Sequence, residues 1–308
     1  MGLTILEAAK LESGVTEKQI IVEEYAGSSD ILLNLPFEDI MGNAIKYNRE
    51  AALPGVGFRG VNESYTASTG VLNPLTESLV IAGGDLDVDK FIVDTMGANQ
   101  RSVQELMKAR ALSLSWTQKF IKGDTASDPR EFDGLQVRVV GDQKIAAGAT
   151  ANGTPLSLAK LDEAIDQTLN PTHIVMSKAM ARKFGKAGRT TTVSGYVTYG
   201  LDELGRRATM YNGLPIITVD LDHEGNAILP FTEAATSGTA TATSIYIVSM
   251  GASGLTGLQN GSIDVRDLGE LQTAPVYRTR VEWYNGIAIY NGRAATRLWS
   301  ISDADITA

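Results

Sequence analysis

The sequence predicts an α+β fold, and three patterns of the 308-residue chain carry this prediction. The first is a long two-stranded excursion over residues 35–82, whose arms hold few large apolar residues. The second is the strongest helical periodicity of the chain, which begins near residue 89 and ends at Lys122. The third is a compact series of alternating helix and strand patterns that follows residue 153.

The excursion predicts a hairpin with an outgoing arm at residues 37–51, a turn at residues 53–57 and a return arm at residues 58–81. The turn is placed on Pro54, Gly55 and Gly57, because Pro fixes one dihedral angle and Gly adopts angles that other residues avoid. An isolated hairpin is marginally stable in water. We therefore expect this hairpin to need a partner surface.

The long helix is predicted at about residues 89–122, with a bend or a later start at Gly97. Its apolar face is expected to consist of Met107, Leu114 and Ile121, broadened by Leu106, Leu112, Trp116 and Phe120. Three acidic residues, Asp85, Asp87 and Asp89, precede the helix. They are interpreted as complementing its macrodipole rather than as a magnesium or calcium site.

The flanking segments complete the expected order of elements. Helices are expected at residues 5–11, 16–25, 158–169 and 177–184, strands at residues 132–140, 173–176, 214–219, 244–250 and 287–290, and loops at residues 141–155 and 236–243. Residues 277–283 alternate between two faces, which is typical of a strand, and Asn285-Gly286 predicts a hairpin turn after them.

The composition limits the classes of function. A formal charge of -9 argues against a protein whose purpose is to grip nucleic acid, because phosphate binding needs a cationic face. The absence of cysteine, and the presence of only two histidines, leave little for metal binding or acid–base catalysis. No apolar run approaches 18 residues and no signal-peptide pattern opens the sequence, so we expect a soluble cytoplasmic product.

Three features of the sequence partly match known cofactor, metal or catalytic motifs. Residues 251–257 are rich in Gly after a predicted strand, but their spacing differs from a dinucleotide-binding loop, and we expect a simple connection and no cofactor. Asp220, Asp222 and Glu224 copy the opening of a calcium loop, yet Phe231 stands where the bidentate Glu belongs, which favours a solvated turn. No Gly-x-Ser-x-Gly elbow accompanies His173 or His223, so no catalytic residue is assigned.

A basic run is the one feature suited to nucleic acid. It consists of Lys178, Arg182, Lys183, Lys186 and Arg189, without an acidic residue among them. Phe184 alone interrupts the run, so it lacks the aromatic ladder that stacks on bases. Subunit contacts or a solvated helix face are the favoured interpretation.

The order of these elements resembles that of a tailed-bacteriophage major capsid protein of the Hong Kong 97 fold. Five segments carry the resemblance, at residues 53–59, 87–91, 120–124 with 132–135, 211–216 with 244–248, and 277–299. The resemblance implies an N-terminal arm at residues 1–34, an E-loop at 35–82, a P domain with a spine helix at 83–152, an A domain at 153–262 and closing P-domain strands at 263–308.

The resemblance implies a structural, non-enzymatic function. Copies would assemble as pentamers and hexamers, first into a procapsid and then into an icosahedral or prolate head that holds double-stranded DNA without sequence-specific binding. The arm before the E-loop is short, which implies a separate scaffolding protein, and a portal and decoration protein are further expected partners. Candidate contacts between subunits are Lys46, Arg49, Glu50, Phe58, Arg59, Arg101, Arg110, Lys183, Lys186 and Arg189.

Two alternatives remain open from the sequence. An encapsulin-like nanocompartment shares the fold and encloses a cargo enzyme instead of a genome. An α/β hydrolase or ligand-binding enzyme belongs to a different class. Covalent cross-linking in some relatives of the family joins an E-loop Lys to a P-domain Asn; Lys46 is the only lysine of residues 35–82, its partner cannot be placed, and no cross-link is assigned.

Overall fold

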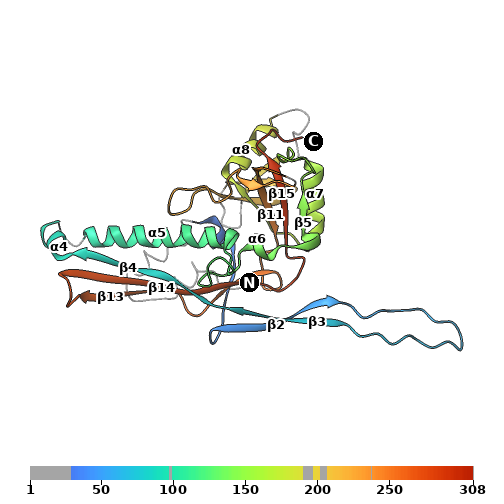
Figure 1. Cartoon of the computed structure of the whole chain (residues 1–308), viewed down its shortest axis with the longest axis horizontal. Helices are drawn as coiled ribbons and strands as arrows, with labels where there is room; N and C mark the ends of the chain where they lie inside the picture. Colours follow the sequence, from blue (N-terminus) through green and yellow to red (C-terminus); the bar gives the residue numbers. More distant parts are fainter. Residues whose placement is uncertain (1–28, 97–98, 190–196, 202–206, 237, 308) are drawn as a thin grey trace.

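The computed structural model describes residues 29–96, 99–189, 197–201, 207–236 and 238–307. Two lobes and a projecting arm make up the described chain (Figure 1). One lobe is an elongated sheet beneath a long helix, the other is a compact α/β unit, and the arm is a two-stranded hairpin. The helices expected at residues 5–11 and 16–25 lie outside the described residues.

The elongated lobe contains a sheet of five described strands. They are β1 (Phe37–Asp39), β4 (Val80–Asp89), β12 (Leu255–Gln259), β13 (Asp264–Glu270) and β14 (Val276–Ile289). The long strand β14 pairs antiparallel with β4, β12 and β13, whereas β1 pairs parallel with β12. The helices α4 (Lys90–Met96) and α5 (Asn99–Lys122) lie along this sheet (Figure 1).

The compact lobe contains a sheet of eight described strands in the order β5-β15-β11-β6-β9-β8-β7, with β10 paired to β11. Its strands are β5 (Lys144–Ala146), β6 (His173–Ser177), β7 (Val197–Leu201), β8 (Arg207–Tyr211), β9 (Leu214–Val219), β10 (Glu233–Ala234), β11 (Ala240–Val248) and β15 (Ala295–Ser302). Its helices are α7 (Leu158–Gln167) and α8 (Lys178–Ala187). The shorter elements α3 (Asp30–Asn34), α6 (Leu135–Arg138) and η1 (Gly141–Gln143) connect or flank the lobes.

The central strands β6 and β11 of the eight-stranded sheet are buried on both faces. Alternate residues of a strand point to opposite faces of the sheet, so neighbouring residues join different clusters. Ile174 and Met176 join the cluster beneath α7 and α8. Val175 between them joins the cluster that contains Trp116 of α5 and Trp283 of β14. The second cluster therefore runs from one lobe into the other and fixes their relative position.

The long helix ends at Lys122, as the sequence predicted, but its buried face differs from the prediction. Trp116, Phe120 and Ile121 are buried as predicted, but Met107 is exposed and Ala109, which was not predicted, is buried. Ser113 and Thr117 also lie on the buried face. Because both are polar, a search for periodic apolar residues does not assign them to that face.

Four local predictions are wrong. The loop expected at residues 141–155 contains η1 and the strand β5. Residues 132–140 contain the short helix α6 rather than a strand. The loop expected at residues 236–243 ends at Ala240, where β11 begins. Asn285-Gly286 makes no turn, because β14 runs straight through it with β4 and β12 paired on its edges. Short apolar runs and Asn-Gly pairs are local patterns, and tertiary pairing overrides them here.

Asn285 has a structural reason to lie inside a strand. It is fully buried, and its Oδ1 accepts a hydrogen bond from Trp116 Nε1 at 3.1 Å. The Trp116 ring also packs on Phe120, with 5.2 Å between ring centroids, and on Trp283, with 6.0 Å. The contact thus joins α5 to the centre of β14.

Replacing Trp116 by Phe is expected to destabilise the protein by about 1–3 kcal/mol, because the buried Asn285 amide loses its donor. The aromatic packing would largely remain. The measurement is the urea dependence of unfolding of the unassembled subunit. The control Trp116→Phe/Asn285→Leu removes both partners, and we expect it to recover part of the loss; an equal or larger loss would contradict this account.

Candidate functional site

The projecting hairpin is the most exposed part of the described chain. It is built from β2 (Ala44–Ala52) and β3 (Val71–Ser78), which pair antiparallel with Ala52 opposite Val71. Residues 53–70 continue beyond the paired strands and extend away from both lobes (Figure 1). This distal part is called the loop tip.

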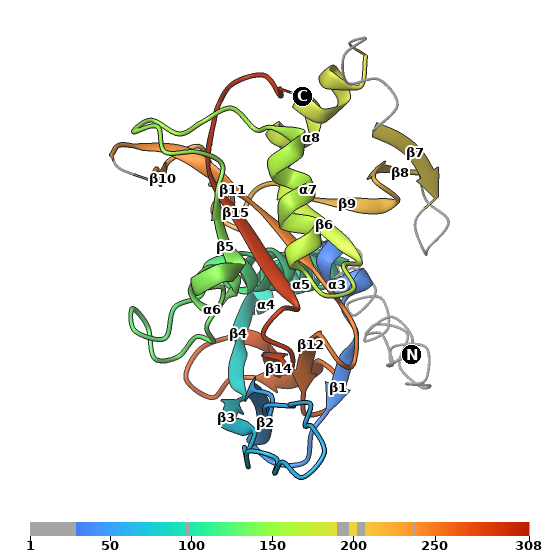
Figure 2. The same ribbon diagram turned by 90° about the vertical axis from the view of Figure 1, so that its right-hand side faces the viewer.

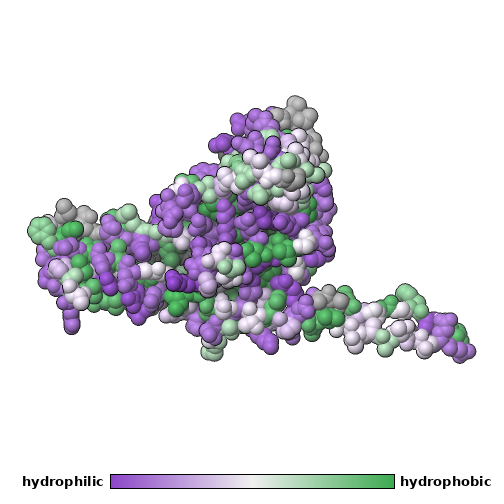
Figure 3. All heavy atoms as spheres, in the orientation of Figure 1, coloured by the Kyte–Doolittle hydropathy of each residue, from purple (hydrophilic) through white to green (hydrophobic). Residues whose placement is uncertain are grey.

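The loop tip carries apolar side chains that have no cover in the described chain. Leu53, Val56, Phe58, Val61 and Tyr65 are all exposed, and Phe58 and Val56 have more than nine tenths of their surface free. Hydrophobic residues are visible at the surface along the projecting arm (Figure 3). Large apolar side chains exposed together on one segment are typical of an interaction surface.

The chain reverses direction at residues 60–63 rather than at the predicted turn of residues 53–57. The Glu63 carboxylate accepts a hydrogen bond from Gly60 N at 2.8 Å, and Asn62 has φ of 69°. Ser68 Oγ donates to Gly55 O at 2.9 Å, so residue 55 lies within the outgoing arm. Asn tolerates positive φ and supplies the reversal that the sequence analysis assigned to the Pro-Gly segment.

The base of the hairpin is fixed to the lobes. Arg49 Nη2 and Tyr47 Oη both donate to the Ile289 carbonyl, at 2.5 and 3.2 Å. Arg138 holds the Glu77 carboxylate through two hydrogen bonds of 2.5 and 2.7 Å. Burial, reinforced by the negative charge of Glu77, raises the pKa of Tyr47. A rigid base thus carries a free tip.

Comparison with known proteins identifies this arrangement. No protein-family model and no curated protein matches the sequence. Among solved structures, the SrpI encapsulin of Synechococcus elongatus PCC 7942 matches with a TM-score of 0.64 and 16% identity, over 90% of this chain and 89% of that one. A structure from Mycobacterium phage Bobi matches with a TM-score of 0.61 and 13% identity, over 99% and 100%.

The capsid of the native GTA particle matches with a TM-score of 0.60 and 15% identity, over 89% of this chain and 91% of that one. The chain has the Hong Kong 97 capsid fold. The hairpin of β2 and β3 with its loop tip corresponds in this fold to the E-loop, and α5 corresponds to the spine helix. The α+β fold that the sequence predicted is confirmed.

Each sheet of this Hong Kong 97 fold combines strands from distant parts of the chain. The strand β12 falls within residues 153–262, yet it belongs to the five-stranded sheet. The strands β5 and β15 fall within residues 83–152 and 263–308, yet both belong to the eight-stranded sheet. Each lobe is therefore assembled from segments far apart in the sequence.

The candidate contact residues of the E-loop fall into two groups. Lys46, Glu50, Phe58 and Arg59 are exposed and point away from the described core. Arg59 also lies over the Tyr65 ring, 5.3 Å from its centroid. Arg49 is instead half-buried, and its guanidinium donates to the Ile289 carbonyl within the subunit.

The candidates outside the E-loop are mostly engaged within the chain. Arg101 forms ion pairs with Glu105 at 3.1 Å and with Asp267 at 2.6 Å. Lys183 and Lys186 pair with Asp303 and Asp305, and Arg189 donates to the Gly185 carbonyl at 3.0 Å. Arg110 is a further candidate outside the E-loop. Its side chain is exposed and lies at the edge of a cleft.

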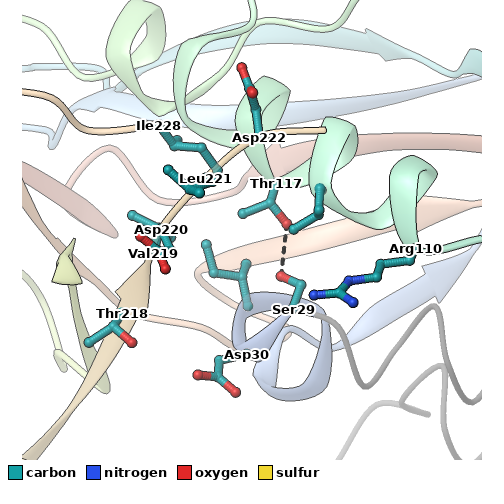
Figure 4. A pocket seen from close by; sticks show the side chains of 12 residues that line it. Ser29, Asp30, Arg110, Thr117, Thr218, Val219, Asp220, Leu221, Asp222 and Ile228 are labelled. Carbon is teal, nitrogen blue, oxygen red and sulfur yellow. Dashed lines mark hydrogen bonds between the residues drawn. The ribbon is translucent and has the colours of Figure 1, made fainter. Parts of the chain in front are cut away.

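That cleft, of about 420 Å³, lies between α3, α5 and the segment that follows β9 (Figure 4). Ser29 and Thr117 meet across its floor at 2.8 Å. Asp222 Oδ1 accepts from the backbone N–H groups of Glu224 and Asn226, and its other oxygen accepts from Gln118. Burial opposes the shift, but the backbone hydrogen bonds from Asn226 and Glu224 lower the pKa of Asp222 below its usual value.

The calcium-like segment is a turn, but it is less solvated than predicted. Asp222 is buried and closes the turn that Gly225 completes with φ of 87°. Within the described residues, no group of three or more His, Asp or Glu side chains could hold a metal ion. The histidines are separate, since His173 is buried in β6 and His223 lies in the turn. No described helix is long and apolar enough to cross a membrane.

Of the three acidic residues before the spine helix, two form ion pairs elsewhere and do not interact with the helix N-terminus. Asp85 forms an ion pair with Arg280 and Asp87 with Arg278, each at 2.6 Å between neighbouring strands β4 and β14. Only Asp89 meets the helix start, where it accepts from Phe91 N at 2.8 Å. These partners could not be predicted, because they lie 191 and 195 residues away and alternating charge on two strands does not by itself give their register.

These ion pairs predict a pH dependence. The hydrogen-bonded guanidinium groups of Arg280 and Arg278 lower the pKa of Asp85 and Asp87 in the folded state. The pairs therefore stabilise the fold above the unfolded pKa of about 3.9, and this contribution is lost as pH falls through the lower folded pKa. We expect the variant Asp85→Asn/Asp87→Asn to have a lower free energy of unfolding than wild type at pH 6. Below pH 3 the two free energies should become equal. The measurement is urea unfolding of the unassembled subunit.

The matched control for this prediction is Asp142→Asn, an exposed carboxylate outside these pairs. Its free-energy difference from wild type should change little over the same range. A gap between the double variant and wild type that stays constant from pH 6 to pH 3 would show that the two aspartates make no pH-dependent contribution.

Proposed function

We propose that this chain is the structural subunit of a phage head. Copies self-assemble as pentamers and hexamers into an icosahedral or prolate shell that encloses double-stranded DNA. The observation that carries the proposal is the E-loop, which presents an exposed apolar tip on a base anchored to Ile289 and Arg138. Such a tip gains stability when a neighbouring subunit covers it, since burial of apolar surface contributes about 25 cal/mol per Å².

Weak contacts repeated over many copies suit a closed shell. The exposed charges Lys46, Glu50 and Arg59 can form ion pairs between subunits that contribute about 0–1 kcal/mol each. Contacts of this size break and re-form, so that misplaced subunits can leave during assembly. A separate scaffolding protein, a portal and a decoration protein are the further partners that we propose, with assembly in the host cytoplasm.

The second candidate is a nanocompartment shell that encloses a cargo enzyme. The likeness to the SrpI encapsulin favours this candidate, just as the likeness to the phage structures favours a head. The two proposals share the subunit fold and the E-loop contacts. They differ in the contents of the shell.

Electron microscopy and light scattering of the purified chain, alone and co-expressed with its gene neighbours, test the proposal. Closed shells are the expected result. Nuclease-protected DNA inside them would support a head, and an enclosed enzyme would support a nanocompartment. A monodisperse monomer or dimer in both preparations, without capsomers or sheets at high concentration, would overturn the shell function.

A further inference from the structure

The helix α8 is amphipathic in charge as well as in hydropathy. Its buried side carries Met180, Phe184 and Ala187, which pack into the cluster beneath the eight-stranded sheet. The basic run of residues 178–189 occupies the remaining surface of the helix. Over these eleven steps a helical stripe spans about 16 Å, enough to face several phosphates of a nucleic-acid backbone.

A segment that follows β15 lies across this basic surface. Residues 303–307 run past α8, and Figures 1 and 2 show the end of the chain beside that helix. Asp303 pairs with Lys183, whose ammonium also donates to the Ala304 carbonyl at 3.0 Å. Asp305 pairs with Lys186 at 2.7 Å. This segment is called the acidic strap.

The strap is docked by its backbone and by one apolar side chain. Thr307 N donates to the Leu156 carbonyl at 2.9 Å, and Leu158 N donates to the Thr307 carbonyl at 3.1 Å. Ile306 packs against the cluster beneath the sheet. The strap therefore holds its two carboxylates in place over α8, although both aspartates remain more than half exposed.

The strap changes the local charge of this surface. The five basic residues of the run face three described carboxylates, Asp303, Asp305 and Asp220, the last of which pairs with Lys178 at 2.9 Å. The local formal charge is then +2, and neutralising the two strap aspartates doubles it to +4. Because the whole chain carries -9, this is a marked local reversal of sign.

We propose that the acidic strap masks a phosphate-binding surface on α8, and that the unmasked surface binds duplex DNA without regard to sequence. Asp305 pairs with the exposed Lys186, where a backbone phosphate can approach. Asp303 pairs with Lys183, whose side chain is only 14% exposed while the strap is docked, so that lysine reaches a phosphate only when the strap is displaced. The basic run lacks an aromatic ladder, so stacking on single-stranded bases contributes little and the duplex backbone is the ligand that its chemistry fits. The mask is a property of one subunit and does not depend on the proposed shell function.

The test compares Asp303→Asn/Asp305→Asn with wild type in the binding of a fluorescent 30-base-pair duplex of arbitrary sequence, by anisotropy between 50 and 200 mM salt. Two freed lysines should add two phosphate contacts and steepen the slope of log affinity against log salt by about 2. The variant should then bind more tightly at 50 mM and lose about tenfold more affinity than wild type across this range. Asp305→Asn alone should give about half of the change in slope.

Two further variants decide the origin of any gain. Asp142→Asn/Asp166→Asn makes the same change in net charge, from -9 to -7, on exposed residues away from the strap, and it should bind as wild type does. Adding Lys183→Gln/Lys186→Gln to the strap variant should abolish the gain. The proposal is overturned by the absence of a gain in folded strap variants, by an equal gain in the charge-matched control, or by a gain that persists without the two lysines. Circular dichroism of each variant establishes that it is folded.

Discussion

A chain in which an Asn-Gly turn replaces residues 53–70 is expected to fold normally and to form no closed shells. Ala52 and Val71 are directly opposite in the hairpin register, so a two-residue turn can join their strands. The replacement removes the exposed apolar tip, including Val56, Phe58 and Val61. If the tip supplies the contact with a neighbouring subunit, its loss abolishes closure of the shell.

The subunit should tolerate this change because its stability lies elsewhere. No residue of the tip belongs to the described buried clusters. The anchors at the base of the hairpin, Arg49 with Ile289 and Glu77 with Arg138, remain in the shortened chain. We therefore expect the unfolding midpoint of the unassembled subunit in urea to be unchanged.

Electron microscopy and sedimentation of the shortened chain check this result beside two controls. Val56→Ser/Phe58→Ser keeps the length of the loop and removes apolar surface, so a loss of assembly in both variants assigns the contact to these side chains. Lys46→Gln keeps the tip and should still assemble, because an exposed ion pair is worth at most about 1 kcal/mol. Closed shells at normal yield from the shortened chain would sink the proposed role of the E-loop.

Elements with their own periodicity could be predicted from the sequence. The strand β9 has the predicted bounds Leu214–Val219, and the spine helix ends at the predicted Lys122. Each presents a repeat of apolar residues that matches its own geometry, without reference to distant parts of the chain. The exposed state of the E-loop tip also followed from its composition, since its residues could not form a core.

Features that depend on distant partners could not be predicted. Asp85 and Asp87 looked like helix-capping groups until β4 was seen beside Arg278 and Arg280 of β14. Arg49 looked free to reach another subunit, whereas it binds a carbonyl 240 residues further along the chain. The sequence indicates charge and spacing, but only the register of the sheet decides which charges meet.

The second large effect is expected at a buried ion pair of the eight-stranded sheet. Arg297 of β15 and Glu233 of β10 pair at 3.0 Å with side chains only 7% and 8% exposed. Ser244 bridges the pair, accepting from Arg297 Nε at 3.0 Å and donating to the Glu233 carboxylate. Breaking a buried pair by removing one partner leaves an uncompensated charge and costs about 3–5 kcal/mol.

The two single variants should lose different amounts of stability, and the neighbouring charges determine which loss is larger. Lys122, at the end of the spine helix, is half-buried, and its burial lowers its pKa while Glu233 opposes that shift. In Arg297→Met, the ammonium of Lys122 still faces Glu233 and offsets part of its charge. In Glu233→Leu, Arg297 and Lys122 are left as two cations without that carboxylate, so this variant should be the less stable of the two.

Urea unfolding of both single variants, the double variant Arg297→Met/Glu233→Leu and the surface control Lys160→Met measures these effects. The double variant should lose less stability than the sum of the single losses, because no charge of the pair remains buried without its partner. Lys160 pairs with Glu163 on the exposed face of α7, so its replacement should cost at most about 1 kcal/mol. Additive losses in the double variant would mean that Arg297 and Glu233 act independently.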